Sequence, residues 1–211
     1  MNYPVIILGA GGHAKVLIDA LILNSVEILL VTDSDPSKKD QLILGIPIKG
    51  MDDEVMKYPP GSVRLVNGIG SICVNPWRRL LFERFKDLGY SFVNVIHPSA
   101  IIASGIAIDE GAQIMAGVVI QTGCTIGRNT IINTNSTVDH DCHIGENTHI
   151  APGVTLSGGI QVGNNTHIGT GATVLQGIAI GRDCLVAAGA VVIRDVPDGA
   201  KIAGIPAKQI R

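Results

Sequence analysis

An aliphatic residue recurs at every sixth position over almost half of this 211-residue chain. The series runs from Ile102 to Val192 without an insertion, and Ile96 extends it one step towards the N-terminus. The residues between are Ile108, Ile114, Ile120, Ile126, Ile132, Val138, Ile144, Ile150, Leu156, Val162, Ile168, Val174, Ile180 and Val186. A fixed short period is the signature of a chain that stacks one structural unit on the next. We therefore expect a stacked, repetitive second half rather than an ordinary globular core.

A small or apolar residue often stands two positions before the aliphatic one. Examples are Ala100, Ala112, Cys124, Ser136, Cys142, Thr148, Ala172, Cys184 and Ala190. A period of two inside a period of six indicates short strands, each with two inward-facing residues and a tight turn after it. Three such strands would close a triangular coil of about eighteen residues, and the coils would stack into a solenoid.

The composition agrees with thin, regular layers. Aromatic residues make up only 3% of the chain and charged residues 16%, whereas hydrophobic residues make up 46%. A core with so few rings must be filled by Ile, Val, Leu and Ala. The net charge is −2, and the chain has no basic run, so neither nucleic acid nor an anionic membrane is an expected partner.

The N-terminal apolar run has no basic segment before it and is too short and glycine-rich for a signal peptide or a membrane span. We therefore expect a cytoplasmic protein. The four cysteines are widely spaced and are expected to be reduced thiols; they are Cys73, Cys124, Cys142 and Cys184. The last three occupy the inward small position, which favours a packing role.

The first half begins with an apolar run at 5–8, expected to be a buried strand, followed by Gly9, Gly11 and Gly12 and a helical pattern over 14–23. A strand, a glycine-rich turn and a helix N-terminus can cradle a phosphate with backbone N–H groups. A second strand over 27–32 ends at Asp33, whose carboxylate could hold a ribose or a base edge. The spacing G-A-G-G-H differs from the dinucleotide motif, so a purely structural turn is the alternative.

Further elements are a strand over 63–67, the segment G-I-G at 68–70, a helix over 77–88 and a strand over 93–96. Arg78 and Arg79 on that helix are expected to form a solvated face. The sequence thus predicts two domains. Residues 1–95 form a Rossmann-like α/β domain with a parallel sheet, and residues 96–211 form the solenoid.

Four motifs occur along the chain: G-A-G-G-H-A-K, I-H-P-S-A, D-H-D-C-H-I-G-E and G-I-P-A-K. With the hexads, they resemble the sialic acid O-acetyltransferase/PglD-like family of hexapeptide-repeat acyltransferases. The resemblance implies a left-handed parallel β-helix and a homotrimer with active sites between neighbouring solenoids. It implies acetyl transfer from acetyl-CoA to the 4-amino group of a nucleotide-linked 4-amino-4,6-dideoxysugar, expected to be UDP-linked, in bacterial glycan biosynthesis.

The resemblance also implies roles for individual residues, without a metal. His140 matches the general base, Asp141 its acidic partner, His149 a histidine near the acetyl carbonyl, and Asn133 a polar residue of the acceptor pocket. Gly158, Thr170 and Ala188 match backbone contacts to acetyl-CoA, and Lys208 a contact to the CoA phosphates. Gly11, Gly12 and His13 match the nucleotide-sugar cradle, with Asp33 and Gly70 beside the nucleoside.

The reaction needs these residue types. The attacking amine must lose a proton, and a histidine titrates near neutrality and can accept it. A carboxylate fixes the histidine tautomer, and a hydrogen-bond donor stabilises the oxyanion. Cys142 faces inward by its register, so it is not expected to be a nucleophile.

Alternation points His143, His149 and His167 outward, with His149 and His167 stacked on adjacent coils of one face. We expect His143 and His167 to form an exposed polar face or a trimer contact.

Three other functions remain open. H-D-C-H could supply zinc ligands, but Cys142 faces the core, and His143 and His149 fall on different faces. The acceptor could instead be a hydroxyl of a sialic or legionaminic acid-type sugar. A scaffold that binds nucleotide sugars without catalysis is the third, although the His140–Asp141 pair argues against it.

Overall fold

The computed structural model describes residues 3–71 and 76–210. They divide into two compact units. The first contains residues 3–70 and 76–98, and the second contains residue 71 and residues 99–210.

The first unit is built on a parallel sheet with the strand order β2-β1-β5. β1 (Val5–Leu8) matches the predicted strand. β2 (Ile28–Thr32) and β5 (Arg64–Asn67) each begin one residue later than predicted, and β6 (Val95–Ile96) begins two residues later. α1 (Gly12–Leu23) begins two residues earlier than predicted, and α2 (Trp77–Asp87) ends one residue earlier. The sequence analysis assigned no element to η1 (Pro36–Lys38), β3 (Leu42–Ile43), β4 (Ile46–Pro47) or η2 (Asp52–Lys57).

One part of the core of this unit lies between α2 and one face of the sheet. Side chains that alternate along β1 and β5 pack against Phe82 and Phe85 of α2, with Tyr90 and Phe92 completing the cluster. The Phe82 and Phe92 ring centroids lie 4.5 Å apart. All seven Phe, Tyr and Trp residues of the chain lie in this unit, and the four in this cluster are buried, since a three-stranded sheet needs large side chains to bury its face.

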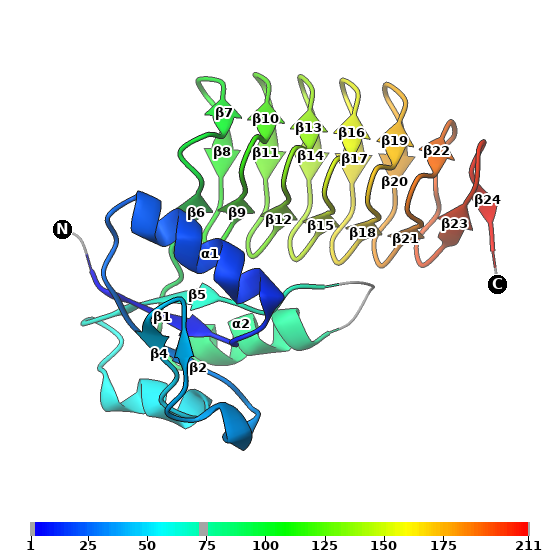
Figure 1. Cartoon of the computed structure of the whole chain (residues 1–211). Helices are drawn as coiled ribbons and strands as arrows, with labels where there is room; N and C mark the ends of the chain where they lie inside the picture. The colour runs from blue at the N-terminus through cyan, green and yellow to red at the C-terminus, as the bar shows by residue number, and fades with distance from the viewer. Residues whose placement is uncertain (1–2, 72–75, 211) are drawn as a thin grey trace. The chain divides into compact units, whose positions relative to one another are not determined.

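The second unit is a parallel β-solenoid of two-residue strands whose successive coils stack as in Figure 1. Its first face contains β7 (Ile101–Ile102), β10 (Val119–Ile120), β13 (Thr137–Val138), β16 (Thr155–Leu156), β19 (Thr173–Val174) and β22 (Val191–Val192). The second face contains β8 (Ala107–Ile108), β11 (Thr125–Ile126), β14 (His143–Ile144), β17 (Gln161–Val162) and β20 (Ala179–Ile180). The third face contains β9 (Gln113–Ile114), β12 (Ile131–Ile132), β15 (His149–Ile150), β18 (His167–Ile168), β21 (Leu185–Val186) and β23 (Lys201–Ala203), with β24 (Lys208–Gln209) antiparallel to β23.

The six-residue period is confirmed residue by residue. Each aliphatic position from Ile102 to Val192 is the second residue of a strand, and from Ile114 onwards all are at most 4% exposed. Cys124, Cys142 and Cys184 are buried in the predicted inward position; burial raises the pKa of the Cys142 thiol to about 11. Cys73 lies outside the described residues.

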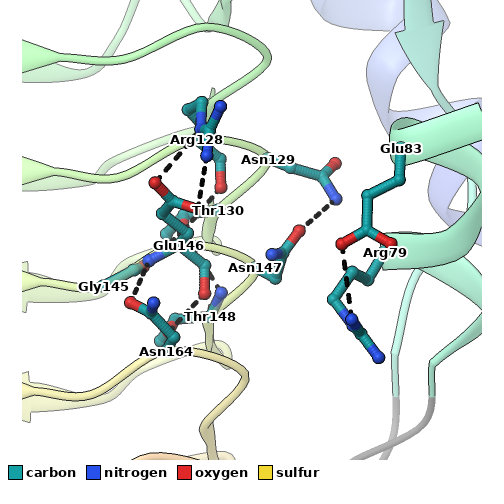
Figure 2. Close-up of polar contacts among 10 residues, drawn as sticks. All are labelled: Arg79, Glu83, Arg128, Asn129, Thr130, Gly145, Glu146, Asn147, Thr148 and Asn164. Carbon is teal, nitrogen blue, oxygen red and sulfur yellow. Dashed lines mark hydrogen bonds and ion pairs between the residues drawn. The ribbon is translucent and has the colours of Figure 1, made fainter. Parts of the chain in front are cut away.

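Polar side chains tie successive coils together at the corner between the second and third faces (Figure 2). Arg128 donates two hydrogen bonds to the Glu146 carboxylate one coil further on, at 3.1 and 2.9 Å. The Asn129 amide donates to Asn147 at 2.8 Å, and the backbone N–H of Glu146 donates to Asn164 at 2.9 Å. These bonds repeat along the stack and hold the coils in register.

No helix among the described residues is long and apolar enough to cross a membrane.

Candidate active site

His140 and Asp141 lie at the corner where the chain passes from β13 to β14, here called the His140 corner (residues 139–142). Asp141 has a positive φ of +60°, a backbone conformation that Asp tolerates better than most residues. His140 Nδ1 and Asp141 Oδ2 lie 2.8 Å apart, so the expected pair is formed. The carboxylate of Asp139 accepts a hydrogen bond from the His140 backbone N–H at 2.7 Å and fixes the corner further.

This contact assigns the tautomer of the neutral imidazole. A carboxylate can only accept, so Nδ1 carries the proton and Nε2 carries the lone pair. The hydrogen bond to Asp141 raises the pKa of His140 above its ordinary value, and the negative charge of Asp139 acts in the same direction. The His140 side chain is half exposed and that of Asp141 is 70% exposed. The pair is thus a proton acceptor on the surface of the chain.

Gly158, one coil further along, lies against the imidazole ring. A Cβ atom built on Gly158 would stand 2.5 Å from His140 Nε2 and 2.6 Å from Cε1. His140 and Gly158 occupy equivalent positions on adjacent coils, eighteen residues apart. The equivalent positions on other coils, which with these two are here called the His140 column, are Ser104, Thr122 and Gln176, which carry side chains. The glycine at position 158 therefore makes room for the ring.

Asn133 and His149 form a second cluster, at the corner between β12 and β13 (residues 133–136, the Asn133 corner) and on the adjoining strand β15. Asn133 Oδ1 accepts from the backbone N–H of Thr134 at 2.8 Å, which orients the amide nitrogen towards His149 Nε2 at 3.1 Å. His149 Nε2 must then accept, so Nδ1 carries the proton and donates to the carbonyl of Ser71 at 2.9 Å. Ser71 Oγ lies 2.8 Å from the same nitrogen.

Both ring nitrogens of His149 are therefore engaged within the chain. Ser71 is a member of this cluster that the sequence analysis did not name. It lies 78 positions before His149, so no local pattern could have indicated it.

Replacing Asn133 by aspartate should move the titration midpoint of His149 to a higher pH. The carboxylate would present an acceptor to Nε2 in place of an amide donor, which favours a second proton on the ring. Histidine-ring NMR during a pH titration measures the midpoint. Asn135→Asp is the control, because Asn135 lies at the same corner but is exposed. Equal titration of His149 in both variants would contradict the contact between residue 133 and His149 Nε2.

The remaining outward histidines differ from each other. His143 on β14 is exposed, as expected, and its Nδ1 lies 2.9 Å from Thr125 Oγ1. The expectation of an exposed position is wrong for His167, which is 7% exposed. Its ring stacks edge-on against His149 with the centroids 4.9 Å apart, and burial lowers the pKa of His167. The predicted stacking of these two rings on adjacent coils is confirmed.

The residues expected to contact acetyl-CoA fall into separate places. Gly158 lies against His140, one coil beyond the His140 corner. Thr170 and Ala188 are exposed and follow the Asn133 corner along the next coils, and Lys208 is exposed on β24. The His140 and Asn133 corners flank the first face on opposite edges, since β13 runs between them. One chain does not bring the two clusters together.

The residues expected to bind the nucleotide sugar meet at one edge of the first unit's sheet. Gly11 caps the N-terminus of α1, and a Cβ atom on Gly11 or Gly12 would meet nothing within 4 Å. A Cβ on Gly70, after β5, would lie 3.1 Å from the Cβ of His13. The backbone there is thus open to a ligand at the helix terminus.

Asp33 is part of the same edge, but its carboxylate already has partners. It accepts from the backbone N–H of Ala10 at 2.8 Å, from that of Asp35 at 2.9 Å and from Lys38 Nζ at 2.9 Å. Partial burial raises the pKa of Asp33, but these hydrogen bonds outweigh it and leave the pKa below its ordinary value. Asp33 therefore braces the glycine-rich turn, and Lys38 is a cation at this edge that the sequence analysis did not identify.

The expectation of a solvated face is wrong for Arg78 and holds for Arg79. Arg78 is 4% exposed, and its guanidinium donates to the carbonyls of Asn67 at 3.0 Å and Ile69 at 2.6 Å. Burial lowers the pKa of Arg78 to about 9, so it remains protonated at neutral pH. Arg79 is exposed and pairs with Glu83 at 3.3 Å (Figure 2). Arg78 thus fixes the segment that leads to Gly70.

The residues of the H-D-C-H stretch do not converge. Cys142 is buried, whereas His143 and His149 lie on the second and third faces. Within residues 3–71 and 76–210, no three His, Cys, Asp or Glu side chains are grouped as a metal site would require.

Two family models match the chain. The PglD N-terminal domain matches residues 4–85, and the bacterial transferase hexapeptide (six repeats) matches residues 107–140, 123–158 and 159–194. No curated protein sequence matches it.

Solved structures with the same fold cover the whole chain. PerB from Caulobacter crescentus, in complex with CoA and GDP-perosamine, is 40% identical, with a TM-score of 0.91 over 99% of this chain and 97% of that one. The acetyltransferase domain of PglB from Neisseria gonorrhoeae, in complex with acetyl coenzyme A, is 32% identical, with a TM-score of 0.91 over 100% of both chains. WeeI from Acinetobacter baumannii is 24% identical, with a TM-score of 0.88 over 99% of this chain and 100% of that one, which shows the shared fold. By its sequence motifs, its two units and these similarities, the chain belongs to the PglD-like family of hexapeptide-repeat acetyltransferases.

Proposed function

We propose that the protein transfers the acetyl group of acetyl-CoA to the 4-amino group of a nucleotide-linked 4-amino-4,6-dideoxysugar. The neutral amine attacks the thioester carbonyl, and His140 Nε2 accepts the proton that the nitrogen loses. The C–S bond then breaks, and the thiolate of CoA leaves and takes up that proton. Acetyl-CoA is already activated, so no covalent enzyme intermediate is needed.

The observation that carries this proposal is the His140–Asp141 hydrogen bond of 2.8 Å. It places the proton of the neutral ring on Nδ1 and leaves a lone pair on Nε2, and a general base requires such a lone pair. It also stabilises the imidazolium that forms when the base accepts a proton. A scaffold that only binds nucleotide sugars would have no use for such a pair.

The active site is completed by a neighbouring copy of the chain in a homotrimer. Two observations support this: the His140 and Asn133 clusters lie on opposite edges of the first face, and the His140–Asp141 pair is largely exposed. A partner could cover the pair and supply Asn133, His149, Thr170 and Ala188. Mixing His140→Ala chains with Asn133→Ala chains should then restore part of the activity that each variant lacks. No recovery in mixed oligomers of confirmed composition would contradict a shared site.

Each of the two domains binds a different substrate. Residues 1–95 bind the nucleotide sugar at the edge formed by Gly11, Gly12, His13, Asp33 and Gly70. Residues 96–211 bind acetyl-CoA through Gly158, Thr170, Ala188 and Lys208. The nucleotide expected from the sequence is UDP, but the GDP-perosamine bound to the Caulobacter relative makes GDP an equal candidate.

Gly12→Val should weaken binding of the nucleotide sugar far more than binding of acetyl-CoA. A branched side chain at the first turn of α1 would fill the open space where backbone N–H groups can approach a phosphate. Calorimetric titration with each ligand separates the two affinities. Asp19→Ala, an exposed position on the same helix but beyond its first turn, is the control. Equal losses for both ligands in Gly12→Val would indicate unfolding or a different nucleotide site.

The decisive experiment is an acceptor screen. The purified protein is given acetyl-CoA and, in separate reactions, a GDP-linked amino sugar, a UDP-linked amino sugar or a sialic acid, and release of the free CoA thiol is followed. Acetylation of a sialic acid hydroxyl, with amino sugars ignored, would favour the O-acetyltransferase alternative. Binding of acetyl-CoA without turnover on any acceptor would favour the scaffold.

A further inference from the structure

On five successive coils, one residue at the corner between the first and second faces has a left-handed backbone. These residues are Gly105 (φ +76°), Gly123 (φ +77°), Asp141 (φ +60°), Gly159 (φ +69°) and Gly177 (φ +74°). A residue with a Cβ atom adopts this conformation at a cost of roughly 1–2 kcal/mol, somewhat less for Asp. Asp141 alone in this column carries a side chain. Such a strained position is a reason to look for function.

The carboxylate of Asp141 uses its two oxygens differently. Oδ2 accepts from His140 Nδ1, whereas Oδ1 lies directly over Gly123, one coil earlier. A Cβ atom on Gly123 would overlap Oδ1 and stand 3.3 Å from Cγ. Position 123 therefore has room for the carboxylate only because it has no side chain.

We propose that Gly123 is a positioning residue for acetyl transfer, because the space above it lets the Asp141 carboxylate reach His140. The inference deepens the proposed function and rests on it. Gly123 touches neither substrate and acts through Asp141.

The backbone around Asp141 cannot yield to a side chain at position 123. The N–H of Asp141 donates to the carbonyl of Thr122 at 3.0 Å, and the N–H of Gly159 donates to the carbonyl of His140 at 2.8 Å. These are ladder bonds between coils. The carboxylate is the far end of a short side chain and can rotate into solvent instead. A methyl group on Gly123 would thus cost little in packing but would break the hydrogen bond to His140.

Gly105 provides a matched control. It lies at the same corner one coil before Gly123, and its φ differs by only one degree. A Cβ atom on Gly105 would meet nothing within 4 Å. Gly105→Ala and Gly123→Ala therefore carry the same backbone penalty, and only Gly123→Ala displaces the carboxylate.

The test is a pH titration of the His140 ring by NMR on the intact protein, which needs no substrate. The charged groups that act on His140 are Asp141 and Asp139. With Asp141 displaced, the midpoint should move to lower pH in Gly123→Ala and stay in place in Gly105→Ala. Melting temperatures should fall by similar amounts in both. If Gly123→Ala fails to fold, Gly123→Asn tolerates the left-handed backbone better and should give the same shift.

Turnover provides the second measurement. Gly123→Ala should lower kcat about tenfold or more while both KM values stay close to those of Gly105→Ala, because a histidine without its carboxylate loses its fixed tautomer. In an Asp141→Ala background, Gly123→Ala should cause no further loss. An unchanged His140 midpoint, an equal effect of Gly105→Ala, or additive losses in the double variant would overturn the inference. Full turnover in His140→Ala would instead overturn the proposed base and leave the NMR result intact.

Discussion

Replacing His140 by alanine is expected to lower kcat by about 10²–10⁴-fold, the range that a general base contributes. The affinity for acetyl-CoA should remain nearly unchanged, because the side chain acts on the proton of the amine and not on the cosubstrate. The half-exposed ring packs on Gly158 and is not part of the solenoid core, so the variant should fold normally. Steady-state kinetics and acetyl-CoA titration measure the two quantities separately.

His143→Ala is the matched control for this variant. His143 is also an exposed histidine, three residues further along, but it lies on the second face and contacts Thr125. We expect its turnover to equal that of the unsubstituted protein. Parallel loss of turnover and acetyl-CoA binding in His140→Ala would mean that the residue is structural, and the proposed mechanism would fail.

Gly158→Ala should have the second largest effect, a loss of kcat on the order of 10²-fold, as misplacement of a catalytic group by about 1 Å can cause. A methyl group at this position would stand 2.5 Å from Nε2 and force the ring to rotate away. Backbone strain is not the cause, since Gly158 has no positive φ and other residues of its column carry side chains.

A double-mutant cycle separates this steric effect from other causes. In a His140→Ala background, Gly158→Ala should lower turnover no further, because the ring that it displaces is absent. A further drop in that background would point to an independent role of Gly158, such as a backbone contact to acetyl-CoA. Retention of full activity in the single variant would show that the position of the ring is not critical.

Much of the fold could be predicted from local patterns. The six-residue period of aliphatic residues assigned every strand from β7 to β22, because each strand buries the same side of the chain in the same way. The period fails only after Val192. Ile180 pairs with Val196, and Val186 pairs with Ile202, so the last coil is two residues shorter than the others. The six-residue repeat does not continue into this last coil, so its strand pairing could not be predicted from the sequence.

The candidate site was predictable only where its members are neighbours in the chain. His140 and Asp141 are adjacent, and their motif indicated them. Ser71 reaches His149 across 78 positions, and Lys38 reaches Asp33 across a turn without periodicity. Arg78 was expected on the surface because charged side chains are usually solvated. Its side chain is instead buried, and the guanidinium donates to backbone carbonyls.

The sequence by itself determined the solenoid, the glycine-rich turn after the first strand and the presence of a histidine beside a carboxylate, since each depends on residues close together in the chain. The tertiary structure decided which atoms of these groups can donate or accept hydrogen bonds and which side chains surround them. It set the tautomers of His140 and His149, buried His167, and placed the Asp141 carboxylate above Gly123 and the imidazole against Gly158. The physical reason is that all of these contacts except the His140–Asp141 bond join residues on neighbouring coils, whose stacking fixes the space around a side chain.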